Sequence, residues 1–265
     1  MQGYVDLWWT PQLPVIYVNN PKCGCSTVKN SLKHAQAARF RSEGRHGFAL
    51  HDDPHVADDC LKRQGITDLL HGDPRIVISC ARNPYTRALS AYLDKVANGD
   101  ISSYRELHGR RPESFEAFLE VLTRTDPTVL DSHFCPQHVN LGLPNVEYDA
   151  IFYLENVGSL QRSLRRMFGD FALETFAPHS RSAQQKLQAF YTPRAIDLVQ
   201  RLYADDFTYL GYSRDLTRAT DAPGEYWTPR GIIPLDANTD PAPAGGLASL
   251  RPVIRFHHLV EARII

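Results

Sequence analysis

The chain has 265 residues, of which 43% are hydrophobic, and its formal net charge is −1 at pH 7. This length and apolar content suffice to bury the core of one α/β domain, or of one domain with an appendage, and they exclude a disordered or fibrous protein. The near-neutral charge argues against a nucleic-acid-binding protein that works through a broad basic surface, so any anion-binding site must be local.

Nothing in the sequence indicates secretion or membrane insertion. The N-terminal segment Met1–Thr10 lacks a basic region followed by an apolar run, and no stretch approaches the ~20 apolar residues that span a bilayer. The five cysteines have no disulfide-scaffold spacing, which fits a reducing compartment. We therefore expect a cytoplasmic chain without a transmembrane segment, unless the sequence is the trimmed form of a lumenal protein.

Two strand–loop–helix units are expected in the N-terminal half. Val15–Asn19 is an apolar, β-branched run, followed by a small-residue loop and a helical segment that includes Val28–Leu32. Ile76–Ala81 has the composition of a buried strand, and Pro84 suits the first turn of a helix over Tyr85–Val96. Two such units predict an α/β fold with a P-loop-like parallel sheet flanked by helices.

The region between these units, Arg41–Asp59, is rich in His, Asp and Gly and is expected to be an exposed loop near the carboxyl edge of the sheet. Residues 221–246 are rich in Pro, Gly, Ala and Asp, which is typical of a linker. We therefore predict a main domain of residues 1–220 and an extension of residues 221–265, whose last segment could dock on its own domain or mediate self-association. Further elements are expected as helices at Ser114–Leu122, Val157–Phe168 and Pro193–Tyr203, and as a strand at Asp149–Leu154.

The loop Pro21–Thr27 lies where a phosphate loop belongs, between a strand and a helix whose positive end attracts anions. Gly24 permits close backbone approach, Ser26 and Thr27 offer hydroxyls, and Lys22 supplies a mobile charge. The order differs from the Walker pattern G-x-x-x-x-G-K-[ST], because the lysine precedes the glycine, and this argues against an ATPase or kinase. Taken alone, the string fits an ordinary helix-capping turn equally well.

A second string, Arg82–Ser90, also follows a strand. Arg82 can form a bidentate hydrogen bond with a phosphate. Ser90, about two turns into the next helix, can donate a further hydrogen bond. An arginine and a serine in these positions are more often ordinary surface residues. Combined with the first loop, however, they predict two anion-binding strand ends and a ligand with two separated phosphate-type groups.

The two strings have the patterns P-K-x-G-x-[ST]-[ST] and R-x-P-x-x-R-x-x-S. They resemble the 5′-phosphosulfate and 3′-phosphate elements of sulfotransferases that use 3′-phosphoadenosine-5′-phosphosulfate (PAPS). The similarity is to the Golgi-type carbohydrate branch (sulfotransferase family 2), which includes the chondroitin 4-O- and HNK-1 sulfotransferases, with heparan sulfate 2-O-sulfotransferase as a more distant relative. It covers roughly residues 15 to 212 and continues through Ser114–Leu119, Asp131–Gln137, Tyr148–Glu155 and Tyr203–Tyr212.

The resemblance implies transfer of a sulfuryl group from PAPS to a hydroxyl of a carbohydrate or small molecule, with adenosine 3′,5′-bisphosphate as the product. Lys22 would hold the bridging oxygen and the sulfuryl group, and Arg82 and Ser90 would bind the 3′-phosphate. In-line transfer needs positioning and charge stabilisation more than covalent help. Lys22 and backbone dipoles can supply that stabilisation in place of a metal, so no metal is expected. A trimmed Golgi enzyme would act in the Golgi lumen. The residues that would line the 5′-phosphate are Cys23, Gly24, Cys25, Ser26 and Thr27.

The sequence departs from the family pattern in three places. Asn83 stands where the family usually has an acid, and the basic residue often found at the position of Asn30 is missing. The Pro-rich tail has no counterpart that we identify.

A general base for the acceptor hydroxyl is expected, and histidine is the usual choice near neutral pH. His51 and His133 are ranked nearly level, and His55 follows them. His51 and His55 lie in the loop where related enzymes place a histidine. Glu155, at the end of its strand, is expected to orient the base, to bind a sugar or simply to cap a helix.

Cys23 and Cys25 are interpreted as small loop residues, because no second cysteine pair supplies metal-ligand spacing. Arg181 is a weaker candidate for the cofactor site, since relatives have a loop near the nucleotide there. A cluster of three arginines forms a solvated helix face or meets an anionic glycan: Arg162, Arg165 and Arg166.

Two other functions remain open from the sequence. One is a P-loop-type phosphotransferase such as a kinase, although a Walker lysine and an acidic metal ligand are missing. The other is a non-catalytic nucleotide- or glycan-binding module on the same fold, against which the presence of Lys22, Arg82 and Ser90 argues.

Overall fold

The computed structural model describes residues 5–64, 75–144, 146, 148–168, 186–223, 225–228 and 231–234. A five-stranded mixed sheet in the order β3-β1-β2-β4-β5 forms its centre. The strands are β1 (Leu7–Trp9), β2 (Val15–Val18), β3 (Lys62–Gln64), β4 (Ile76–Ala81) and β5 (Ala150–Tyr153).

Three neighbouring strands, β2, β4 and β5, run parallel. Val15 pairs with Ile76 across the first interface, and Ala81 pairs with Tyr153 across the second. At the other edge β1 is antiparallel to both β2 and β3. The predicted α/β fold with a parallel sheet is therefore confirmed for the three strands that carry the site, and an antiparallel edge extends it.

The parallel strands are buried on both faces, as βαβ connections require. Successive side chains of a strand point to opposite faces, so one strand contributes to two cores. Val15 and Tyr17 of β2 pack with helices α1 (Cys25–Ser42) and α5 (Val157–Phe168) on one face, whereas Ile16 and Val18 join the larger core on the other.

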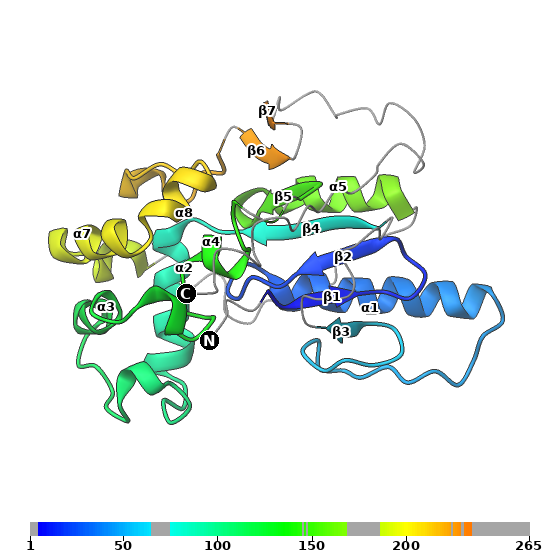
Figure 1. Cartoon of the computed structure of the whole chain (residues 1–265), viewed down its shortest axis with the longest axis horizontal. Coiled ribbons are helices and arrows are strands. Elements are labelled where there is room, and N and C mark those ends of the chain that lie inside the picture. The colour runs from blue at the N-terminus through cyan, green and yellow to red at the C-terminus, as the bar shows by residue number, and fades with distance from the viewer. Residues whose placement is uncertain are drawn as a thin grey trace, which may run out of the picture.

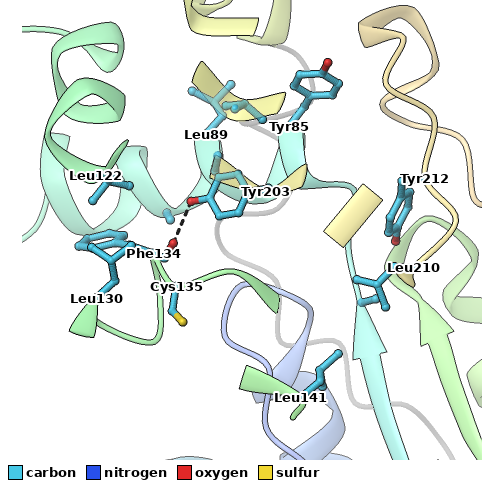
Figure 2. Packing of buried hydrophobic residues seen from close by; sticks show 14 of the residues in the cluster. Tyr85, Leu89, Leu122, Leu130, Phe134, Cys135, Leu141, Tyr203, Leu210 and Tyr212 are labelled. Carbon is cyan, nitrogen blue, oxygen red and sulfur yellow. Dashed lines mark hydrogen bonds between the residues drawn. The ribbon is translucent and has the colours of Figure 1, made fainter. Parts of the chain in front are cut away.

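The larger core is formed with helices α2, α3, α7 and α8, which gather at one end of the molecule, while α1 and α5 run alongside the strands (Figure 1). Figure 2 shows its aromatic centre, where the Tyr203 hydroxyl donates a hydrogen bond of 2.9 Å to the Phe134 carbonyl. This bond satisfies a polar group that would otherwise be costly to bury. The helices are α2 (Pro84–Ala91), continued by the π-helix η1 (Tyr92–Ala97), and α3 (Phe115–Thr123), α4 (Gln137–Asn140), α7 (Pro193–Leu202) and α8 (Ala204–Tyr209).

Helix starts agree with the signals in the sequence. The Ser114 side chain caps α3 by accepting the Ala117 N–H at 3.1 Å, and Pro84 is the first residue of α2. Two strands, β1 and β3, were not expected, since both are only three residues long and β3 reads Lys-Arg-Gln. The loop between α1 and β3 has no helix or strand, as predicted.

The described part of the extension holds a hairpin of β6 (Glu225–Thr228) and β7 (Gly231–Pro234), which lies beyond β5 in Figure 1. Its strands fall inside the segment interpreted as a linker. Residues 235–265 lie outside the described residues, so the domain boundary near residue 220 stays a prediction.

Candidate active site

The carboxyl ends of β2, β4 and β5 meet at one edge of the sheet, where ligands bind in open α/β folds. The chain leaves β2 through Pro21–Gly24 and enters α1 at Cys25. It leaves β4 through Arg82 and Asn83 and enters α2. The two strings identified in the sequence therefore lie on neighbouring strands.

The loop before α1 presents backbone N–H groups rather than a side-chain cap. Lys22 (φ 68°) and Gly24 (φ 80°) both adopt left-handed backbone conformations, and no side chain caps the helix at Gly24. The first N–H groups of a helix have no partner within it, and no acidic side chain lies in the first turn of α1. A side chain at position 24 would also approach Leu154 Cδ1 to 3.0 Å. These features fit an anion at the start of α1.

Lys22 forms an ion pair with Asp94 of η1, with 3.0 Å between Lys22 Nζ and Asp94 Oδ2. Burial lowers the pKa of Lys22, although Asp94 opposes this effect. Burial raises the pKa of Asp94, but Lys22 and Lys95 outweigh it, and the net pKa lies below its ordinary value. The side-chain exposures of 13% for Lys22 and 25% for Asp94 leave the ion pair within reach of a ligand.

Arg82 is buried at the end of β4. Its Nε donates to Thr86 Oγ1 at 3.0 Å, and its Nη1 donates to the Lys22 carbonyl at 3.2 Å. Burial lowers the pKa of this guanidinium, while Cys23 and Glu155 raise it. The second bond joins the two anion-binding strings directly.

Ser90 lies one helical turn after Thr86 on α2, so Arg82, Thr86 and Ser90 are aligned along one side of the helix start. Ser90 is 6% exposed, and its hydroxyl has no hydrogen-bond partner among the described residues. An additional acceptor, such as a phosphate oxygen, would satisfy it.

The buried side chain of Gln137 ties both loops together. Its Oε1 accepts hydrogen bonds from Asn20 Nδ2 (3.1 Å), Cys23 Sγ (3.1 Å) and the Arg82 N–H (3.0 Å), and its Nε2 donates to the Arg82 carbonyl (2.8 Å). Asp206 holds the backbone of Gln137 in turn, through an N–H bond of 2.8 Å. One amide therefore fixes the relative position of the two strings.

A second arginine, Arg87, is hydrogen-bonded to the first loop. Its fully buried guanidinium donates to the carbonyls of Pro21 (3.0 Å), Cys135 (2.9 Å) and Ser132 (3.0 Å). Sequence reasoning assigned no role to Arg87 or Gln137. Their positions within the R-x-P-x-x-R string and the Asp131–Gln137 segment were the available signals.

His55 is brought to the first turn of α1. Its Nε2 lies 2.8 Å from Ser26 Oγ, and its Nδ1 lies 2.6 Å from Lys29 Nζ. Partial burial, followed by the adjacent Lys29 ammonium, lowers the pKa of His55 to about 4. The imidazole is therefore neutral at physiological pH.

The loop that carries His55 is wrapped around the ammonium of Lys33, one turn further along α1. Lys33 Nζ donates to the carbonyls of His51 (3.1 Å), Asp53 (2.8 Å) and Val56 (2.7 Å), and it lies 2.9 Å from Asp58 Oδ2. The His51 ring itself is exposed and accepts the Asp53 N–H at 3.0 Å. The described structure gives His51 no contact with the phosphate loop.

His133 forms a dyad with Asp131, with 2.6 Å between His133 Nδ1 and Asp131 Oδ1. Burial raises the pKa of Asp131, but the hydrogen bonds from His133 outweigh it and hold the pKa below its ordinary value. A carboxylate on Nδ1 fixes the proton there and leaves Nε2 as a hydrogen-bond acceptor. Arg87 donates hydrogen bonds to the carbonyls of both Pro21 and Ser132, so the segment that carries His133 lies beside the first loop.

Glu155 lies at the end of β5 and is engaged on both carboxylate oxygens. Oε1 accepts the Asn83 N–H at 2.8 Å, and Oε2 accepts the Tyr212 hydroxyl at 2.9 Å. Burial raises the pKa of Glu155. These contacts correspond to the capping role among the expected alternatives. Asn83 caps α2 in turn, since its side chain accepts the Tyr85 N–H at 3.0 Å.

The remaining candidates have simple surroundings. Cys23 and Cys25 are buried, and burial raises the pKa of the Cys23 thiol to about 12. Thr27 lies in the first turn of α1. Arg181 lies outside the described residues.

Within the described ranges, no group of three His, Cys, Asp or Glu side chains could hold a metal ion, and no helix is long and apolar enough to cross a membrane.

Comparison with known proteins identifies the class to which this site belongs. Residues 5–213 match the model of the sulfotransferase family, which covers more than half of the chain. No curated protein and no solved structure matches the chain. The chain belongs to the sulfotransferase family, a class of PAPS-dependent transferases, and its mixed sheet with flanking helices is consistent with that fold.

Proposed function

We propose that this protein transfers a sulfuryl group from PAPS to a hydroxyl group of a carbohydrate. The observation that carries the proposal is the direct connection between two anion-binding strand ends, where Arg82 Nη1 donates to the Lys22 carbonyl. The start of α1 and Lys22 suit the 5′-phosphosulfate, and Arg82 and Ser90 suit the 3′-phosphate. Family membership supports PAPS as the donor.

In the proposed reaction, the acceptor oxygen forms a bond to sulfur, and the bond from sulfur to the 5′-phosphate oxygen breaks. The electron pair of that bond leaves on adenosine 3′,5′-bisphosphate. Lys22 offsets the negative charge that develops on the leaving oxygen, a type of interaction that lowers barriers when it is positioned in advance. Asp94 holds the lysine at this edge of the sheet until the donor binds.

We propose His133 as the general base that accepts the proton of the acceptor hydroxyl. Its Nε2 is the acceptor nitrogen when Asp131 fixes the proton on Nδ1. His55 has both ring nitrogens engaged, and the His51 ring accepts a hydrogen bond from Asp53 within its own loop. His133 is therefore the candidate whose geometry suits proton transfer best.

The carbohydrate acceptor is supported by the order of motifs shared with the glycan branch of the family, from the phosphate loop to the Tyr203–Tyr212 segment. A small-molecule hydroxyl is the alternative. The test is transfer of ³⁵S from labelled PAPS to a panel of oligosaccharides, with phenols and simple alcohols in parallel. We expect label on at least one saccharide; label only on phenols or alcohols would refute the carbohydrate assignment.

A pair of matched lysine variants distinguishes transfer catalysed by this protein from transfer by a contaminating enzyme. Lys22→Ala should abolish most of the transfer, whereas Lys62→Ala, which changes a half-buried lysine of β3 paired with Asp59, should leave it intact. A kinase would instead transfer the γ-phosphate of ATP in the presence of Mg²⁺. A non-catalytic module would bind adenosine 3′,5′-bisphosphate without transferring label to any acceptor.

A further inference from the structure

We propose that Lys29 and His55 form a relay that orients the Ser26 hydroxyl, so that Ser26 donates its proton to the 5′-phosphate group of the donor. The inference rests on the proposed function, and it adds Lys29 and His55, which lie outside the two family strings. In this arrangement His55 is a positioning residue, and it acts on the anion through Ser26.

The direction of the relay follows from the donors available. The Lys29 ammonium has only N–H donors, so at 2.6 Å the His55 Nδ1 must accept. A neutral imidazole carries one proton, which is then on Nε2, and this N–H donates to Ser26 Oγ at 2.8 Å. The hydroxyl oxygen is therefore used as an acceptor, and its own proton is free for another partner.

The proton must reside on Lys29 rather than on His55 for this argument to hold. Lys29 Nζ lies 4.3 Å from the centre of the Trp8 ring, whose face favours a cation. Burial lowers the pKa of Lys29, while Cys25 and Asp6 raise it. The pKa of His55, about 4, is far below neutrality, so the lysine retains the shared proton.

The local fold holds the relay in place. Ser26, Lys29 and Lys33 are spaced by three and four residues, so they line one face of α1. Lys33 fixes the loop on this face through three carbonyls, and the His55 N–H donates to Asp53 Oδ1 at 2.8 Å. Ser26 lies in the first turn of α1, beside the N–H groups that we assign to the 5′-phosphate. His55 is the only hydrogen-bond partner of its hydroxyl among the described residues.

The test uses calorimetric titration of the whole chain with adenosine 3′,5′-bisphosphate and with adenosine 3′-monophosphate, which lacks the 5′-phosphate. Ser26→Ala should weaken binding of the bisphosphate by about tenfold, the usual loss for one hydrogen bond to a charged group. Lys29→Met and His55→Ala should weaken it by about three- to tenfold, because each frees the hydroxyl to point elsewhere. None of these changes should alter binding of the 3′-monophosphate.

Two further variants distinguish a relay from a structural role. In a Ser26→Ala background, His55→Ala should have no additional effect, because His55 acts through the missing hydroxyl. His55→Gln should bind the bisphosphate within about twofold of the unmodified protein, since an amide can accept from Lys29 and donate to Ser26. Lys29 is fully buried, so Lys29→Met could fail to fold. In that case the two His55 variants, which change an exposed residue, distinguish the relay from a structural role.

Additive losses for Ser26→Ala and His55→Ala would overturn the relay, as would equal weakening of the 3′-monophosphate. Failure of His55→Gln to restore binding would also overturn it. The proposed function fails on a different result, in which the unmodified protein binds the bisphosphate no more tightly than the 3′-monophosphate. The relay would then fall with it, because no 5′-phosphate would be recognised.

Discussion

Three lysines near the phosphate loop illustrate how context sets the role of one residue type. Lys22 is partly exposed and pairs with a single carboxylate, Asp94, so it can change partners when a ligand arrives. Lys33 is fully buried and surrounded by carbonyls, so it holds a loop in place. Lys29 lies between an aromatic ring and His55, and it directs a hydrogen bond.

Lys22→Ala should reduce turnover by about 10²–10³, because the lysine acts on charge that develops only in the transition state. Affinity for adenosine 3′,5′-bisphosphate should fall much less. Arg82→Ala should show the reverse order, with weakened binding first. Steady-state kinetics with calorimetry of the two variants makes the comparison, and near-normal turnover of Lys22→Ala at saturating PAPS would contradict the assignment.

Asp131→Asn should lower turnover while leaving the affinity for adenosine 3′,5′-bisphosphate unchanged. The amide can no longer hold the proton on His133 Nδ1 as a carboxylate does, so the favoured tautomer is lost. His133→Ala should give a loss at least as large, and the double variant should be no worse than His133→Ala alone. His51→Ala provides the control, since the described hydrogen bond of its ring is to Asp53 in its own loop. Equal losses in His51→Ala and His133→Ala would argue against the dyad.

At the scale of elements, one face of α1 organises the loop between α1 and β3. The Lys33–Asp58 pair has side-chain exposures of 0% and 3%, and removing one partner of such a pair leaves a buried charge uncompensated. Lys33→Met should therefore lower the free energy of unfolding by about 3–5 kcal/mol. Urea denaturation measures the change. Lys62→Met, which removes an ion pair with side-chain exposures of 39% and 44%, is the control and should change stability by less than about 1 kcal/mol.

The sequence predicted those elements whose signals are local. The apolar runs at β2, β4 and β5, the cap Ser114 and the first helical residue Pro84 are examples, because each signal depends on neighbouring residues. The edge strands β1 and β3 were missed, since three residues give too short a pattern and their pairing partners are distant in the sequence.

The same distinction applies to the candidate site. The two anion-binding strings were identified from their composition, but the connection through Gln137 joins residues 55 or more positions apart. The contact between His55 and Lys29 likewise depends on how Lys33 folds the intervening loop. Side-chain contacts of this kind depend on tertiary packing. The sequence alone therefore could not show that His55, rather than His51, contacts the first turn of α1.

For the whole molecule, stability should depend on pH through His55. Its pKa is about 4 in the folded state and 6.5 ordinarily, so between these values the unfolded chain binds a proton that the folded chain does not. Stability should therefore be lost as the pH falls from 6.5 to 4. Urea unfolding across this range, with His55→Gln alongside, isolates the effect. The variant should show a shallower decline, and parallel curves would contradict the lowered pKa of His55.

The central claim is that two connected strand ends bind a nucleotide with separate 5′ and 3′ anions. Thermal-shift titrations test it most directly, by comparing adenosine 3′,5′-bisphosphate with AMP and with ATP plus Mg²⁺. We expect the bisphosphate to stabilise the protein by about 2.7 kcal/mol at 100 times its dissociation constant, and the other two ligands to do so only at far higher concentrations. A response to AMP equal to that of the bisphosphate, or a preference for ATP with Mg²⁺, would contradict the account.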